Sequence, residues 1–281
     1  MVLFFTLPPK DIPWPYVLCN ARNINKCINY IHNNINNIRA IILDSGIEVF
    51  RDPNIKNYPG GREYWINRLV NLYKKLQLVS KGQVFVTCPD YCDDYNPRSL
   101  WVSEDFTNIE RTVENILYCV DNYPEVNWLI PIQGHNSSPN SIISSIALLQ
   151  EFGITKKYDY YGLANLCVER KKDILIETVK LASRLLKGKR IHVFGPKLPS
   201  LPGIQKYIYS FDSTAWTRPS YFAIKYYIEP NKKPIRSCWN TFERKLYFLS
   251  WILTAIYKYN IMIDGINVKK YLELFLSLLA Q

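Results

Sequence analysis

Residues 40–46, Ala-Ile-Ile-Leu-Asp-Ser-Gly, are the stretch that best defines the fold. A short apolar run is typical of a strand buried on both faces, and the polar tag after it is typical of such a strand's end. The same arrangement recurs along the chain. It predicts seven strands, at residues 16–20, 40–44, 84–88, 128–132, 158–163, 190–194 and 207–211.

Segments with helical spacing lie between these runs, at residues 25–38, 63–78, 104–122, 138–152 and 170–186. This alternation predicts βαβ units and a parallel sheet. We therefore expect an α/β fold, a (β/α)8 TIM-type barrel, whose eighth strand comes from residues 220–237 or 261–263. A doubly wound open sheet is the alternative, because the link at 194–207 is short and rich in proline.

Two further helices are expected near the C-terminus, at residues 241–259 and 268–279, each strongly apolar on one face. An apolar face must be buried, so these helices are expected to pack on the barrel. The prediction is a single domain over residues 1–281, with the C-terminal helices from about residue 240.

The composition favours an anionic partner. Thirty-five Lys and Arg against 24 Asp and Glu give a net charge of +11, which attracts nucleic acid; a basic surface without a ligand is the alternative. The seven cysteines are odd in number and several lie in apolar runs, so we expect reduced thiols in a cytoplasmic protein. No apolar run has the length of a membrane span, so no membrane is expected.

A bound metal or cofactor is not expected. Cys88 and Cys92 form an isolated CxxxC pair, whereas a structural zinc site needs four clustered ligands. The barrel is accordingly predicted without a zinc module.

Polar tags follow nearly every predicted strand, and the C-terminal ends of barrel strands meet at one mouth. A single carboxylate after a strand would be read as a helix cap. Three of them, Asp44, Asp90 and Asp212, together with Gln133, predict a shared polar pocket. Paired carboxylates suit cleavage of a glycosidic bond, since one attacks the anomeric carbon while the other moves the proton.

These tags resemble, in order and placement, the motifs of the tRNA-guanine transglycosylases and of their relatives that insert 7-deazaguanines into DNA. The matching segments are Asp44-Ser45-Gly46, Gln133-Gly134, Gly162-Leu163-Ala164 and Phe211-Asp212-Ser213-Thr214-Ala215-Trp216-Thr217-Arg218. The similarity spans about residues 40–220. It departs from the family after Gly46, where a second Gly and a Gln are missing, and the family's C-terminal zinc module is not visible.

The resemblance implies a pentosyltransferase in which Asp212 is the nucleophile on C1′ of the sugar and Asp44 is the general acid and base. It also implies that guanine or a preQ0-like 7-deazaguanine is held by Asp90, Gln133, Gly134, Gly162 and Leu163. The missing zinc module favours DNA over tRNA as the substrate.

A basic run after Asp212 is expected to contact phosphates, with tyrosines that could stack on an extruded base. Its members are Arg218, Lys225, Lys232, Lys233 and Arg236. An ordinary solvated loop is the alternative.

Two other functions stay open at this point. One is a non-catalytic nucleic-acid-binding barrel or accessory subunit, and the other is a hydrolase that releases a modified base. Exchange and hydrolysis begin with the same covalent step, so the sequence does not separate them. It also leaves open DNA against tRNA, the 7-substituent and a homodimer.

Overall fold

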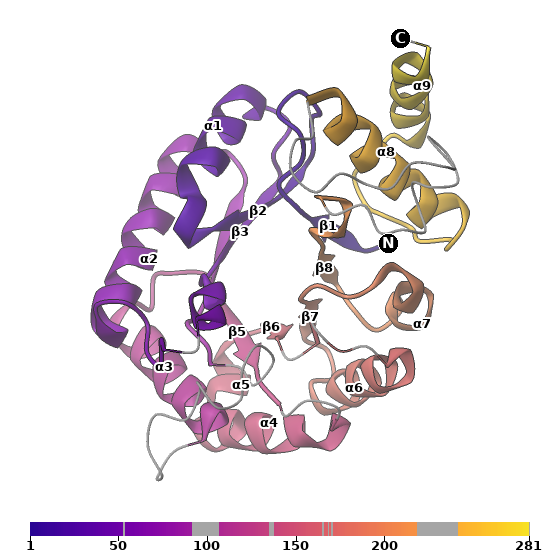
Figure 1. The fold of residues 1–281 in the computed structure, drawn as a ribbon. Helices are drawn as coiled ribbons and strands as arrows, with labels where there is room; N and C mark the ends of the chain where they lie inside the picture. The colour runs from indigo at the N-terminus through magenta and orange to yellow at the C-terminus, as the bar shows by residue number, and fades with distance from the viewer. Residues whose placement is uncertain are drawn as a thin grey trace.

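The chain folds into a ring of eight parallel strands surrounded by helices (Figure 1). The computed structural model describes residues 1–52, 54–91, 107–134, 138–164, 166–167, 169, 171–217 and 241–280. The strands are β1 Leu3–Phe5, β2 Tyr16–Asn20, β3 Ala40–Asp44, β4 Gln83–Thr87, β5 Trp128–Ile132, β6 Tyr160–Leu163, β7 Arg190–Val193 and β8 Ser210–Asp212. Their spatial order is β1-β8-β7-β6-β5-β4-β3-β2.

The first and last strands in this order, β1 and β2, are joined through Thr6, the residue that follows β1. Thr6 forms a parallel bridge with Val17, its N–H donates to the Tyr16 carbonyl at 3.1 Å, and its carbonyl accepts from the Leu18 N–H at 3.0 Å. The predicted (β/α)8 TIM-type barrel is therefore confirmed, and the open-sheet alternative is wrong.

The eighth strand is where the sequence prediction fails. It is β1, at the N-terminus, whereas we expected it at residues 220–237 or 261–263. Residues 220–237 lie outside the described part of the chain. In the other segment Ile263 makes only an isolated bridge with Val2, just before β1. A three-residue strand followed by Pro8 and Pro9 is too short to show a pattern.

The helices follow the predicted alternation. The main ones are α1 Ile24–Asn34, α2 Gly61–Val79, α3 Asn108–Asn122, α4 Ile142–Glu151, α6 Lys172–Leu185, α8 Thr241–Tyr257 and α9 Val268–Leu279. Two short helices, α5 Ile154–Lys157 and α7 Leu201–Ile204, complete the described set, with short 3-10 helices in several loops. The proline-rich link before β8 thus holds only the four residues of α7 as α-helix.

The C-terminal helices pack on the barrel beside β1. The Phe4 ring of β1 stacks on Trp251 of α8 with centroids 4.7 Å apart, and Trp14 meets Phe248 edge to face at 5.3 Å. In α9, the Tyr271 ring lies 5.6 Å from Trp14. Large aromatic rings contribute much of the apolar area buried here, so α8 closes the helical layer over the strand that sequence analysis missed.

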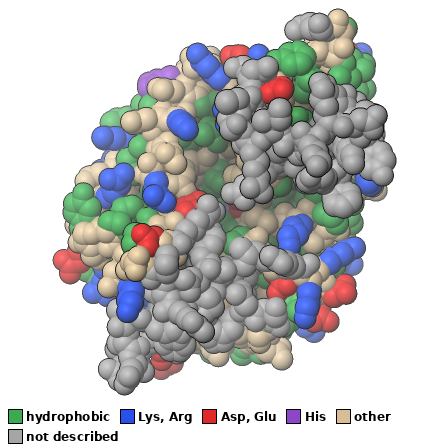
Figure 2. Space-filling view, viewed as in Figure 1, with side chains coloured by type: hydrophobic (Ala, Val, Ile, Leu, Met, Phe, Trp, Pro, Cys, Tyr) green, Lys and Arg blue, Asp and Glu red, His purple; other side chains and the backbone are tan. Residues whose placement is uncertain are grey.

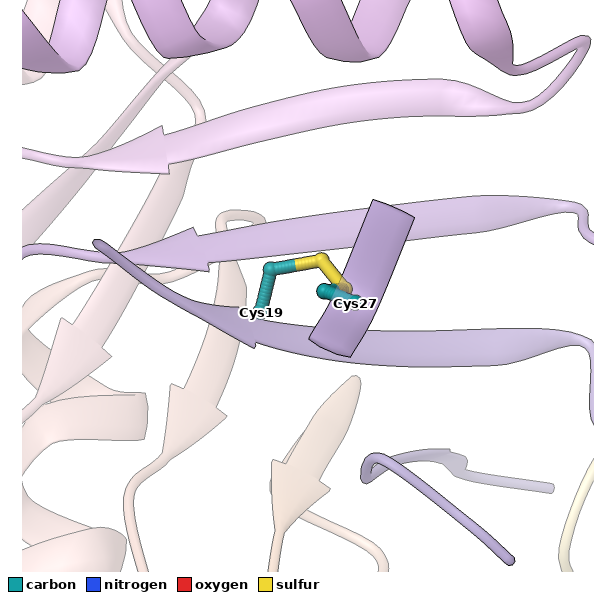
Figure 3. The surroundings of a disulfide bond; sticks show 2 residues. All are labelled: Cys19 and Cys27. Carbon is teal, nitrogen blue, oxygen red and sulfur yellow. A yellow bond between two sulfur atoms is a disulfide. The ribbon is translucent and has the colours of Figure 1, made fainter. Parts of the chain in front are cut away.

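A disulfide joins Cys19 at the end of β2 to Cys27 in α1, with a Cα–Cα distance of 5.5 Å (Figure 3). The expectation of reduced thiols is therefore wrong for this pair. Of the other cysteines in the described segments, Cys88 and Cys119 are buried thiols outside this disulfide, and Cys167 is half-buried.

We expect reduction of this disulfide to destabilise the fold. Closing a loop of eight residues removes about 2.5 kcal/mol of chain entropy from the unfolded state, which corresponds to roughly 5 °C in unfolding temperature for a chain of this size. Differential scanning calorimetry after refolding in dithiothreitol checks this. Cys27→Ser should unfold at the same lower temperature with or without reductant. An unchanged unfolding temperature in the reduced wild type would contradict the prediction.

None of the helices in the described segments combines the length and hydropathy that a membrane span requires. Within those same segments, no group of three or more His, Cys, Asp or Glu side chains is arranged to hold a metal ion.

Candidate active site

The ends of two strands place a carboxylate each at the barrel mouth. Asp44 ends β3 opposite Asn20 of β2, and Asp212 ends β8 opposite Phe5 of β1. Since β1 and β2 are neighbours through Thr6, two strands separate the carboxylates around the ring. Segments 168 residues apart in the sequence thus meet at the mouth.

Asp44 is held by the turn that follows β3. Its Oδ1 accepts from the Gly46 N–H at 3.3 Å, and its Oδ2 accepts from Asn20 Nδ2 at 3.2 Å. The same Asn20 amide donates to Glu48 Oε2 at 2.8 Å. Gly46 has φ +84°, a left-handed conformation that Gly adopts without strain. The turn therefore brings a second carboxylate, Glu48, beside Asp44.

The electrostatic surroundings of Asp44 favour its protonated form. Burial raises the pKa of Asp44 well above the ordinary value of 3.8. The negative charges of Glu48, Asp90 and Asp212 raise it further, in that order of strength, while the Gly46 N–H lowers it. A carboxylic acid that keeps its proton above the usual pH is suited to general acid catalysis.

Asp212 has one oxygen fixed and the other available. Its Oδ1 accepts from the Gly195 N–H at 3.0 Å and lies 3.2 Å from His192 Nε2. Gly195 has φ +58°, and an added Cβ would lie 3.0 Å from Cys167 Cβ, so this backbone donor depends on a glycine. No described residue hydrogen-bonds to Oδ2. The side chain is 11% exposed, so Oδ2 is the oxygen that a ligand could meet.

A buried chain of polar side chains lies behind Asp212. Tyr160 Oη is 2.6 Å from Ser210 Oγ, which is 2.8 Å from His192 Nδ1. A carboxylate only accepts, so Nε2 donates to Asp212; in the tautomer in which Nε2 carries the only ring proton, Nδ1 accepts from Ser210 Oγ, which in turn accepts from Tyr160. Burial raises the pKa of Tyr160, so the phenol keeps its proton. With that tautomer, all donors in the chain point toward Asp212.

Asp90 and Gln133 form the opposite side of the site. Ser45 Oγ donates to Asp90 Oδ1 at 3.0 Å, and Gln133 Nε2 donates to Oδ2. Tyr58 braces the backbone of Asp90, donating to its carbonyl at 2.9 Å and accepting from its N–H at 3.2 Å. Gln133 is 1% exposed, and its Oε1 has no partner among the described residues. An unpaired buried acceptor is costly, so a ligand with an N–H donor would complete it.

Gly162 faces an aromatic ring and not open space for a ligand. A Cβ on Gly162 would lie 2.5 Å from the Phe194 ring, so the absent side chain makes room for that ring. Phe194 also packs edge to face on His192 with centroids 4.5 Å apart. The Leu163 side chain is fully buried, and its carbonyl accepts from the Phe194 N–H at 3.2 Å. Gly134 follows Gln133 and is buried.

Sequence reasoning missed several residues of this site: Asn20, Glu48, Tyr58, Tyr160, His192, Phe194, Gly195 and Ser210. Phe194 and Gly195 directly follow β7. The others lie inside strands or after the altered turn, where only three-dimensional neighbours reveal them. The predicted phosphate contacts at Arg218, Lys225, Lys232, Lys233 and Arg236 lie outside the described residues.

No known protein-family model matches this chain, and no curated protein matches it either.

Proposed function

We propose that the chain is a glycosyltransferase that exchanges guanine for a 7-deazaguanine base in nucleic acid, DNA in preference to tRNA, through a glycosyl ester on Asp212. The observation that carries the proposal is the contrast between two carboxylates at one mouth. Asp44 sits where its proton is retained, whereas Asp212 has Oδ1 fixed by hydrogen bonds and Oδ2 without a partner among the described residues. Carboxylates with different surroundings suit the roles of acid and nucleophile.

The first half of the reaction would form the ester. Asp212 Oδ2 attacks C1′, the C1′–N9 bond breaks, and its electron pair stays on the departing guanine, which takes the proton of Asp44. The second half reverses these steps with the incoming base. Its N9 attacks C1′, the bond between C1′ and Oδ2 breaks, and the N9 proton goes to Asp44. No other reactant is needed, and Asp212 returns to a carboxylate.

Recognition of a purine-like base fits the far side of the site. Gln133 Oε1, which has no partner among the described residues, could accept from an N–H group on the polar edge of guanine, and the Asp90 carboxylate, which accepts from Ser45 and Gln133, lies beside it. The Phe194 ring, half-buried over Gly162 of β6, adds an apolar surface at the strand ends. A base without N–H donors on that edge would leave the Gln133 acceptor unpaired and should bind poorly.

Radiolabelled base exchange tests the proposal. DNA and tRNA that contain radiolabelled guanine are made by synthesis. Each is incubated with the protein and an unlabelled preQ0-like base. Loss of label that requires both protein and added base supports exchange. Loss of label without added base supports hydrolysis, and retention of label on both polymers, with binding intact, supports a non-catalytic barrel.

His192→Leu should slow ester formation by roughly 10- to 100-fold while leaving affinity for the base unchanged, since it removes a donor behind Asp212 without touching the ligand. His192→Gln, which keeps an N–H donor, should recover much of the rate. The kcat and KM for exchange and the unfolding temperature of both variants are the measurements. Equal rate losses in both variants, in step with lost stability, would show a purely structural role.

A further inference from the structure

A basic groove of about 620 Å³ lies outside the barrel, between the start of α1 and the outer side of α2. Its cationic side chains are Arg22, Lys26, Arg68 and Lys75, and no carboxylate lines it. Four asparagines and Tyr64 supply further polar groups. Figure 2 shows Lys and Arg side chains over the flank where Figure 1 places α1 and α2.

These four cations have no ionic partner in the part of the chain that the structure describes. None of them forms an ion pair with a carboxylate of the described segments, whereas Arg39, Arg62 and Arg190 elsewhere on the surface do. Like charges gathered without counter-charges repel one another, so such a groove favours an anionic ligand.

The guanidinium of Arg68 is held in place at the groove by contacts with neighbouring residues. Its Nη2 donates to the Ala21 carbonyl at 3.2 Å, and its guanidinium lies over the Trp65 ring at 5.4 Å. Its buried Nε finds no acceptor among the described residues. A preorganised guanidinium loses little entropy on binding an oxyanion, which makes it a better phosphate ligand than a mobile side chain.

The groove adjoins the candidate active site. Arg22 follows two residues after Asn20, the residue that bonds Asp44. Trp65, beneath Arg68, donates from Nε1 to the Ser45 carbonyl at 2.9 Å. From Tyr64 to Lys75 the groove follows α2 for roughly 16 Å, the axial length of about four or five nucleotides.

We propose that this groove binds the sugar-phosphate backbone of the nucleic acid whose nucleotide enters the mouth. That this polymer is the substrate of the reaction rests on the proposed function. Its binding in the groove does not depend on that function. The groove lies on the β2–β3 side, away in sequence from residues 218–236, where phosphate contacts were expected. Binding in the groove would not depend on the base sequence, because the phosphates are the same at every nucleotide.

Salt-dependent binding tests this inference. The Lys26→Gln/Lys75→Gln variant changes two exposed residues, and Lys180→Gln/Lys187→Gln on the α6 flank removes the same charge as a control. Binding of labelled single-stranded DNA, duplex DNA and an RNA hairpin is measured from 50 to 200 mM salt. The slope of log affinity against log salt concentration is negative. The groove variant should make it less steep by about 1.4–1.8 for the polymer that binds in the groove, and the control should change it by much less. Equal slopes in both variants would overturn the inference.

The outcome is separable from that of the proposed function. If the groove variant loses affinity but the wild type forms no ester with any polymer, the groove stands and the transglycosylase proposal fails. If the ester forms and the groove variant keeps wild-type slopes, the groove inference alone fails. The polymer whose slope changes most shows whether the groove accepts DNA or RNA.

Discussion

Asp212→Asn is expected to abolish base exchange, lowering the rate by at least about 10⁴-fold, because an amide oxygen cannot replace the attacking carboxylate. The amide oxygen of Asn can still accept from the Gly195 N–H and from His192. The variant should therefore fold normally and bind nucleic acid within about twofold of the wild type. Single-turnover exchange with saturating protein measures the chemical step directly.

Asp173→Asn is the matched control, since Asp173 is an exposed carboxylate in the first turn of α6. It should exchange at the wild-type rate. Exchange by Asp212→Asn within tenfold of the wild type would remove Asp212 from the mechanism and, with it, the proposed ester.

Asp44→Asn should make the protein more stable and less active at the same time. The folded pKa of Asp44 is raised above its unfolded value, so the stability linked to its proton is complete below the unfolded pKa and is lost as pH rises through the folded one. Each pKa unit of that shift costs ~1.4 kcal/mol once Asp44 ionises. Asn carries no charge to bury, so at pH 8 the variant should unfold at least ~2 °C higher than the wild type.

The activity of the same variant should fall by roughly 10²- to 10⁴-fold, because the departing base loses its proton donor. In the wild type, the rate of ester formation should decline as pH rises through the raised pKa of Asp44; in Asp44→Asn it should be low and flat. Calorimetry and single-turnover rates from pH 5 to 9 give both curves. A variant that is less stable at pH 8, or whose ester formation keeps the wild-type pH dependence, would contradict this role.

Much of the barrel could be predicted because apolar strands with polar ends leave a local pattern. The bounds of β3 and β5 agree with the prediction at both ends. In β1 the pattern fails because three residues are too few, and its burial depends on Phe211 and Trp251, which come from the other end of the chain.

The candidate site was predictable where a residue ends a strand, and not where its role depends on a distant partner. Asp44, Asp90, Gln133 and Asp212 follow apolar runs, so their convergence follows from the fold. In the sequence, His192 cannot be distinguished from any other interior residue of a predicted strand. Its pairing with Ser210 and Asp212 needs the register of β7 against β8, which local periodicity does not contain.

The most direct test of the proposed chemistry is mass spectrometry of the protein after reaction. The protein is incubated with DNA, and separately with tRNA, in the presence of a preQ0-like base; it is then denatured, digested with nuclease and protease, and mapped. The proposal predicts a pentosyl ester on the peptide that carries Asp212, present with one polymer and absent from Asp212→Asn. An unmodified Asp212 peptide with both polymers, under conditions where each is bound, would contradict it.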